Sequence, residues 1–257
     1  MALKQTLIIF TIIMLFSGIA NSTEEKKFSG EGEVGLLITS GNSENESVNA
    51  KLGLKYETGQ MLSEANLGAL YSSEKTETDG KKEDKVSAEK YNYSAKVGYK
   101  FDEANYVFIN GAYEDDRFSG YDYRTSFAVG YGRKVIQNDK INLNIELGPG
   151  YRYDRTNGYP DPDVKDGFIQ EKTEDEAIFR GYGMFSYKFT DTASFQQDIT
   201  VEAGSDNRVT KSVSALKSRI MGALSMKASY TLTNTSSPPD DKDKTDTETA
   251  LTLVYDF

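Results

Sequence analysis

The stretch INLNIEL, residues 141–147, decides the fold class. Its apolar side chains alternate one by one with polar ones, which is the period of a β-strand whose two faces meet different surroundings. The same alternation recurs through most of the chain after residue 27, and no comparable stretch has the period of a helix. We therefore expect an all-β fold with strands at residues 28–40, 46–57, 61–72, 87–101, 105–116, 121–135, 140–154, 176–189, 193–203, 210–221, 224–235 and 246–257.

The connections between these strands alternate in length. Every second one is short, as at 102–104 and 190–192, whereas most of the intervening ones are longer and polar, as at 73–86, 155–175 and 236–245. Short turns at one end and long loops at the other are typical of bacterial outer-membrane barrels. An even number of strands then places both termini at the short-turn end, which is the periplasmic side.

The length of the strands distinguishes this fold from soluble β proteins. A soluble β-sandwich or a lipocalin-type barrel would show the same alternation, but soluble strands average about five or six residues. About eleven residues at ~3.3 Å each, tilted by ~40°, span roughly 28 Å, close to the apolar band of a membrane barrel. We therefore predict that residues 28–257 form a transmembrane antiparallel up-and-down β-barrel of about 12 strands. Its place would be the outer membrane of a Gram-negative bacterium, in contact with lipid and lipopolysaccharide.

The N-terminus has the layout of an export signal. Lys4 precedes an apolar run at residues 7–16, and the small residues Gly18 and Ala20 occupy positions −3 and −1 of a cleavage site. A membrane-spanning helix is the alternative, but the run is too short to cross the hydrocarbon comfortably. We expect a signal peptide at 1–20 and a short segment at 21–27 before the barrel.

The C-terminus resembles an assembly signal. Leu253, Tyr255 and Phe257 lie on one face of the last predicted strand and end the chain on an aromatic residue. This pattern resembles the signal that the outer-membrane insertion machinery reads, so that machinery is an expected partner.

Composition argues against several classes of function. The chain has no histidine and no cysteine, so triads that need an imidazole or a thiol, and the usual zinc ligands, are absent. We expect no enzyme activity, no cofactor and no metal site. The net charge of −10 argues against nucleic acid as a partner. The acidic loops at 161–176 and 240–248 lack the spacing of an EF-hand and fit a solvated surface, with divalent ions bridging to lipopolysaccharide as the alternative.

The polar face of the strands predicts a lumen. Charged side chains at mid-depth cannot face lipid, because each would cost about 2–4 kcal/mol. Three arginines on neighbouring strands, hereafter the arginine row, fall inward near the long-loop end: Arg124, Arg152 and Arg180. The row favours anions, because arginine stays charged at any relevant pH; the alternative is that Asp122 and Asp154 neutralise it. The remaining lumen-lining candidates are Glu146 and Lys188.

Several segments together resemble a known family of unknown function, usually called salt-induced outer-membrane proteins. The resemblance spans roughly residues 28–257, although this chain has no tryptophan and carries Phe28 where the family pattern has one. It implies a barrel in the outer membrane and no established activity or site residues. The segments are GEVG at 32–35, TSGNS at 39–43, YVF at 106–108, DRFSGYDYR at 116–124, GYG at 130–132, TDT at 245–247 and LVYDF at 253–257.

Two functions remain open on the sequence. The first is a narrow passive channel for ions or small polar solutes, which only the name of the family links to salt or osmotic stress. The second is a non-conducting structural or surface-interaction barrel of the cell envelope. The sequence decides neither the solute nor the oligomeric state.

Overall fold

The computed structural model describes residues 27–39, 45–78, 81–156, 158–160, 168–169, 171–239 and 242–257. The predicted signal peptide at 1–20 lies outside the described residues. Within the described ranges, no helix is long and apolar enough to cross a membrane.

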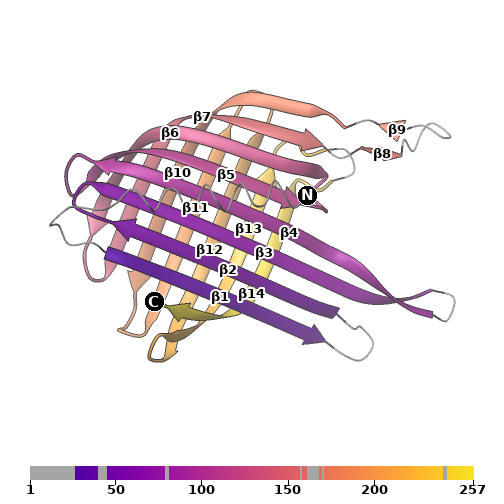
Figure 1. Cartoon of the computed structure of the whole chain (residues 1–257), viewed down its shortest axis with the longest axis horizontal. Helices are drawn as coiled ribbons and strands as arrows, with labels where there is room; N and C mark the ends of the chain where they lie inside the picture. The colour runs from indigo at the N-terminus through magenta and orange to yellow at the C-terminus, as the bar shows by residue number, and fades with distance from the viewer. Residues whose placement is uncertain are drawn as a thin grey trace.

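The chain forms a closed barrel of twelve antiparallel strands (Figure 1), which confirms the predicted fold class. Each strand pairs with the next along the chain, except that β7 pairs with β10 and β14 closes on β1. The strands are β1 (Lys27–Thr39), β2 (Asn45–Glu57), β3 (Met61–Thr78), β4 (Lys81–Lys100), β5 (Asn105–Asp116), β6 (Tyr121–Gln137), β7 (Ile141–Thr156), β10 (Thr173–Lys188), β11 (Ala193–Ala203), β12 (Arg208–Met221), β13 (Leu224–Thr235) and β14 (Thr245–Asp256).

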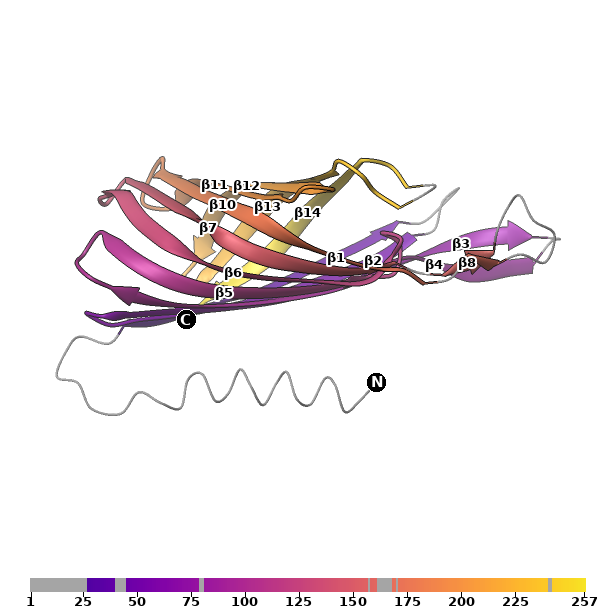
Figure 2. The same ribbon diagram turned by 90° about the horizontal axis from the view of Figure 1, so that it is seen from above.

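Two of the predicted loops contain strand. The loop expected at 73–86 is mostly an extension of β3 and β4, which pair as far as Thr78 and Lys81 and run out past the other strands (Figures 1 and 2). These residues are polar on both faces, so the alternation that revealed the other strands is missing here. Within the loop expected at 155–175, β8 (Tyr159–Pro160) and β9 (Phe168–Ile169) form a short hairpin.

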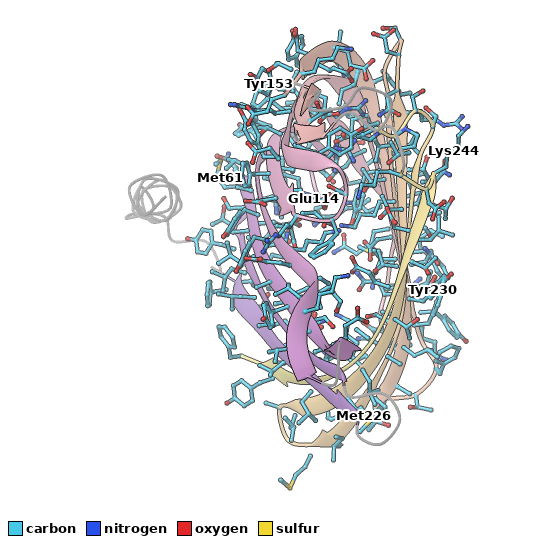
Figure 3. All side chains as sticks on the ribbon, turned by 90° about the vertical axis from the view of Figure 1, so that its right-hand side faces the viewer. Met61, Glu114, Tyr153, Met226, Tyr230 and Lys244 are labelled. Atoms are coloured by element: carbon cyan, nitrogen blue, oxygen red, sulfur yellow. The ribbon has the colours of Figure 1, made fainter. Side chains whose placement is uncertain are left out.

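The two faces of the barrel have opposite character. On β7, for example, Ile145 and Leu147 are exposed on the outside, whereas Glu146 between them is fully buried. The view down the barrel shows the same division, with Glu114 inside the ring of strands and Tyr230 outside it (Figure 3). The structure is thus apolar on its exterior and charged in its interior, the reverse of a soluble domain.

Aromatic side chains form two belts on the exterior. At the long-loop end, four tyrosines on adjacent strands form a ladder with ring centroids 5.9–6.0 Å apart: Tyr93, Tyr113, Tyr123 and Tyr153. At the short-turn end, pairs such as Tyr187 and Phe189 pack edge to face at 5.1 Å. Such belts are expected where amphipathic rings meet the two interfaces of a bilayer.

A small apolar cluster occupies part of the interior. Tyr106 and Phe108 of β5 point inward and are almost fully buried with Leu62, while Val107 and Ile109 face outward. The rings lie against strand β6, where a Cβ on Gly132 would come within 2.2 Å of the Tyr106 ring. Glycine is therefore required there for this close approach.

Candidate functional site: the lumen

The most enclosed charge in the lumen is the carboxylate of Glu146, which is 0% exposed. It accepts hydrogen bonds from Lys96 Nζ at 2.6 Å, from the Tyr106 hydroxyl at 2.8 Å and from Arg180 Nη1 at 3.1 Å. Lys96 Nζ also lies 2.9 Å from Glu64. Two cations and two carboxylates are thus joined in one network in which each charge has a partner.

An aromatic ring completes this network. The Tyr182 ring lies 5.5 Å from Lys96 Nζ and 5.4 Å from Arg180 Cζ, within the range of cation–π attraction. Its hydroxyl donates to Asp198 at 2.6 Å. We call this group the septum; its members project from β3, β4, β5, β7 and β10 and meet inside the lumen: Glu64, Lys96, Tyr106, Glu146, Arg180 and Tyr182.

The septum separates two polar cavities. An outer chamber of about 320 Å³ lies toward the long loops and reaches Arg124 and Arg152. An inner chamber of about 300 Å³ lies toward the short turns and reaches Glu57 and Lys134. Both cavities are lined by Glu64, Lys96 and Tyr182, so these septum side chains stand between them.

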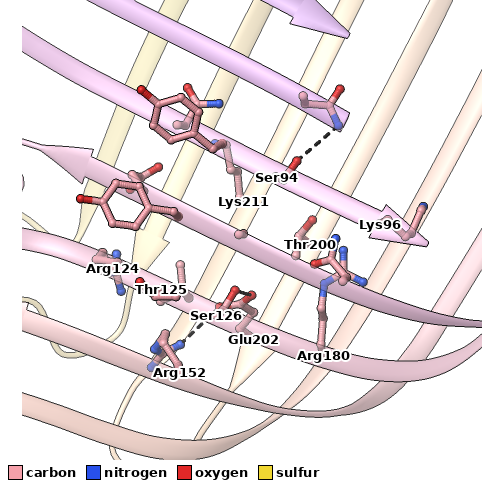
Figure 4. A pocket seen from close by; sticks show the side chains of 18 of the residues that line it. Ser94, Lys96, Arg124, Thr125, Ser126, Arg152, Arg180, Thr200, Glu202 and Lys211 are labelled. Atoms are coloured by element: carbon pink, nitrogen blue, oxygen red, sulfur yellow. Dashed lines mark hydrogen bonds and ion pairs between the residues drawn. The ribbon is translucent and has the colours of Figure 1, made fainter. Parts of the chain in front are cut away.

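The arginine row lies in the lumen, and every member of it is paired. Arg124 Nη2 lies 3.5 Å and Arg152 Nε 3.1 Å from Asp154, while Arg180 binds Glu146. Arg152 has two further carboxylate partners, Glu176 and Glu202. Figure 4 shows Arg152 beside Glu202 in the outer chamber. Ion pairs therefore neutralise the row, as in the alternative, but of the two carboxylates expected there only Asp154 takes part, together with Glu146, Glu176 and Glu202.

Two of the predicted lumen residues are placed elsewhere. The prediction that Asp122 faces the lumen was wrong. A register shift in β6 turns Tyr121 into the lumen and leaves the Asp122 side chain 52% exposed, 3.7 Å from Arg155. The inward Tyr121 ring packs under Arg124 at 4.2 Å. Lys188 is the last residue of β10 and is exposed at the short-turn rim.

Several lumenal carboxylates were not expected from the sequence. At the short-turn end, the Glu57 carboxylate lies 2.9 Å from Lys100 Nζ and 2.7 Å from Lys134 Nζ. At the other end, Lys90 lies within 3.5 Å of three carboxylates: Glu114, Asp116 and Glu248. All four lie inside the predicted strands, so following the inward alternation to the ends of those strands would have found them.

Outside the strands, turn chemistry fixes the short connections. The Asp102 carboxylate accepts hydrogen bonds from the Asn105 side chain and from the N–H groups of Ala104 and Asn105. These bonds lower the pKa of Asp102, and the bond from the Asn105 side chain contributes most. Among the described residues, no group of three or more acidic side chains is placed to hold a metal ion. The acidic positions 161–167 lie outside the described residues.

The C-terminal residue closes the barrel. The ladder between β1 and β14 comprises only the pairs from Glu31–Asp256 to Val34–Leu253. Phe257 extends it, because its N–H donates to Gly30 O at 2.9 Å and its carbonyl accepts from Gly30 N–H at 2.7 Å. Its ring lies 6.3 Å from that of Phe28. Phe257 is therefore part of the seam of the barrel as well as of the predicted assembly signal.

Comparison with known proteins finds one matching family and several solved β-barrels of similar fold. The family described as "Protein of unknown function, DUF481" matches residues 32–257. The uncharacterized protein YdiY of Escherichia coli (strain K12) is 26% identical over 235 residues, 91% of this chain and 85% of that protein.

Two solved structures resemble the fold at low identity. The translocator domain of the autotransporter NalP from Neisseria meningitidis is 13% identical, with a TM-score of 0.48 over 100% of this chain and 96% of that one. An outer membrane channel from Pseudomonas putida F1 is 10% identical, with a TM-score of 0.46 over 94% and 98%. At these identities and scores neither likeness bears on what this chain does.

Proposed function

We propose that this chain, which belongs to the family of unknown function DUF481, is a Gram-negative outer-membrane β-barrel that passes ions or small polar solutes through a narrow lumen. Its apolar exterior and aromatic belts suit a bilayer, and its charged interior suits water. Export would depend on cleavage after Ala20. Mass spectrometry of the protein from outer membranes should find Asn21 as the first residue, and a chain that retains residues 1–20 would contradict this step.

The observation that carries the channel proposal is the pair of polar chambers separated by a single layer of side chains. Polar solutes can be hydrated in each chamber, and only the septum has to be passed between them. Because the septum holds Lys96 and Arg180 against Glu64 and Glu146, its charges balance. We therefore expect low conductance with weak preference between cations and anions.

Single-channel recording of the purified protein in planar bilayers tests this function. The septum variant Glu146→Ser with Arg180→Ser removes both partners of one ion pair, so it widens the passage without leaving either charge buried alone. The matched control is Arg155→Ser with Glu171→Ser, an exposed pair outside the lumen. We expect the septum variant to conduct several-fold more than the wild type and the control to equal it.

The second candidate function is a non-conducting structural or surface-interaction barrel. The hydrogen bonds of the septum favour it, since they join side chains of several strands inside the lumen and narrow the path there. Silence of both the wild type and the septum variant would support this candidate and refute the channel. A link to salt or osmotic stress rests on the name of the resembled family, and growth of a deletion strain across a range of sodium chloride concentrations would test it.

A further inference from the structure

Most of the charged side chains that line the outer chamber are already paired with one another or with other lumenal groups. Eight of its lining side chains are charged, and seven of them already form ion pairs with lumenal partners. Lys211 is the exception among the described residues. An anion could pair only with Lys211, which shares the chamber with the carboxylates of Glu114 and Glu202. Any other charged ligand would have to compete with the existing ion pairs in a partly desolvated site.

The uncharged lining offers hydrogen-bonding groups that these ion pairs do not use. Asn66, Asn92 and Asn110 project into the chamber from the adjacent strands β3, β4 and β5. Asn66 donates to Ser94 at 3.3 Å, whereas the Asn92 side chain donates no hydrogen bond within the described part of the chain. A carboxamide offers two donors and one acceptor with two lone pairs, so it can bind adjacent hydroxyl groups that both donate and accept.

We propose that the outer chamber binds a small uncharged solute rich in hydroxyl groups, of the size of a single sugar ring, with Asn92 as a principal contact. A volume of about 320 Å³ corresponds to roughly ten waters at ~30 Å³ each, which is room for one such ring. Neutral hydroxyls satisfy the amides and leave the ion pairs intact. This inference names the solute class of the proposed channel, but binding itself requires no conduction.

The chain also offers a matched control. Asn142 lines the inner chamber on the other side of the septum and carries the same amide, which donates to Ser186 at 3.4 Å. Asn92→Leu removes hydrogen-bonding groups from the outer chamber alone, and Asn142→Leu removes them from the inner chamber alone. A nonspecific effect of either change on the barrel would appear equally in both variants.

The test is equilibrium dialysis of the full purified protein in detergent against radiolabelled glucose, with gluconate as the charged analogue of similar size. We expect saturable binding of glucose, weaker binding of gluconate, and about tenfold weaker glucose binding in Asn92→Leu, which corresponds to ~1.4 kcal/mol. Asn142→Leu should bind glucose as the wild type does. Asn66→Leu serves in place of Asn92→Leu if the latter does not show the heat-modifiable mobility of a folded barrel.

The inference is overturned if glucose does not bind saturably, if gluconate binds more tightly than glucose, or if both asparagine variants lose binding equally. Recording from the same preparation separates it from the proposed function. Glucose binding without conductance would support this inference and refute the channel. Conductance without glucose binding would support the channel and refute this inference.

Discussion

Replacing Glu146 with leucine is the substitution whose effect on stability follows most directly from the structure. The carboxylate is 0% exposed and holds Lys96, Tyr106 and Arg180 together. After its removal, Lys96 keeps Glu64 and Tyr106 keeps Asn144. Arg180 loses its carboxylate partner among the described residues. A buried guanidinium without a counter-charge is the main cost.

The expected loss of folding free energy is about 3–5 kcal/mol, the usual cost of removing one partner of a buried ion pair. Glu146→Gln keeps the size and an acceptor but not the charge, so it should cost about half as much, since bonds to a charged acceptor are roughly twice as strong. The matched control is Glu202→Leu. Glu202 accepts from Ser126 at 2.9 Å and lies 3.8 Å from Arg152, which has other partners, so about 1 kcal/mol is expected.

Urea titration of the protein in lipid vesicles measures these differences, with heat-modifiable mobility as the readout of the folded barrel. The order of cost should be Glu146→Leu, then Glu146→Gln, then Glu202→Leu. A cost for Glu146→Leu below that of Glu202→Leu would refute the reasoning, because it would mean that Arg180 does not depend on Glu146.

Three further predictions concern charge, packing and closure. Replacing the arginine row with glutamines leaves lumenal carboxylates unpaired, so the reversal potential across a salt gradient should move from near zero to cation selectivity; an unchanged potential would remove the row from the conduction path. Gly132→Ala should cost about 1–3 kcal/mol in urea titration through its contact with the Tyr106 ring, whereas Gly111→Ala, whose Cβ would meet open space, should cost little; equal effects would contradict the packing. Deleting Phe257 should abolish folded barrel in outer membranes, and wild-type amounts on a heat-modifiability gel would count against its role in the seam.

The strand alternation predicted the architecture because each inward and outward position meets a different medium. INLNIEL places Glu146 inside and its apolar neighbours outside, as the structure does. The sequence could not predict which charges meet. Lys96 and Glu146 are 50 residues apart, and their contact depends on the register and curvature of four strands. Alternation also fails at a register shift, which is why Asp122 was placed inside in place of Tyr121.

Thiol accessibility tests the central claim, a water-filled lumen divided by a septum, most directly, because the chain has no native cysteine. Ser94→Cys reports on the outer chamber, Ser186→Cys on the inner chamber, and Phe127→Cys on the apolar exterior. A charged, membrane-impermeant thiol reagent added to intact cells should modify Ser94→Cys readily. The reagent should modify Ser186→Cys only after the outer membrane is opened, or when Ser186→Cys is introduced into the septum variant. It should modify Phe127→Cys slowly under all of these conditions. Fast labelling of Phe127→Cys with protection of Ser94→Cys would invert the faces of the barrel, and equal labelling of Ser94→Cys and Ser186→Cys in intact wild-type cells would contradict the septum.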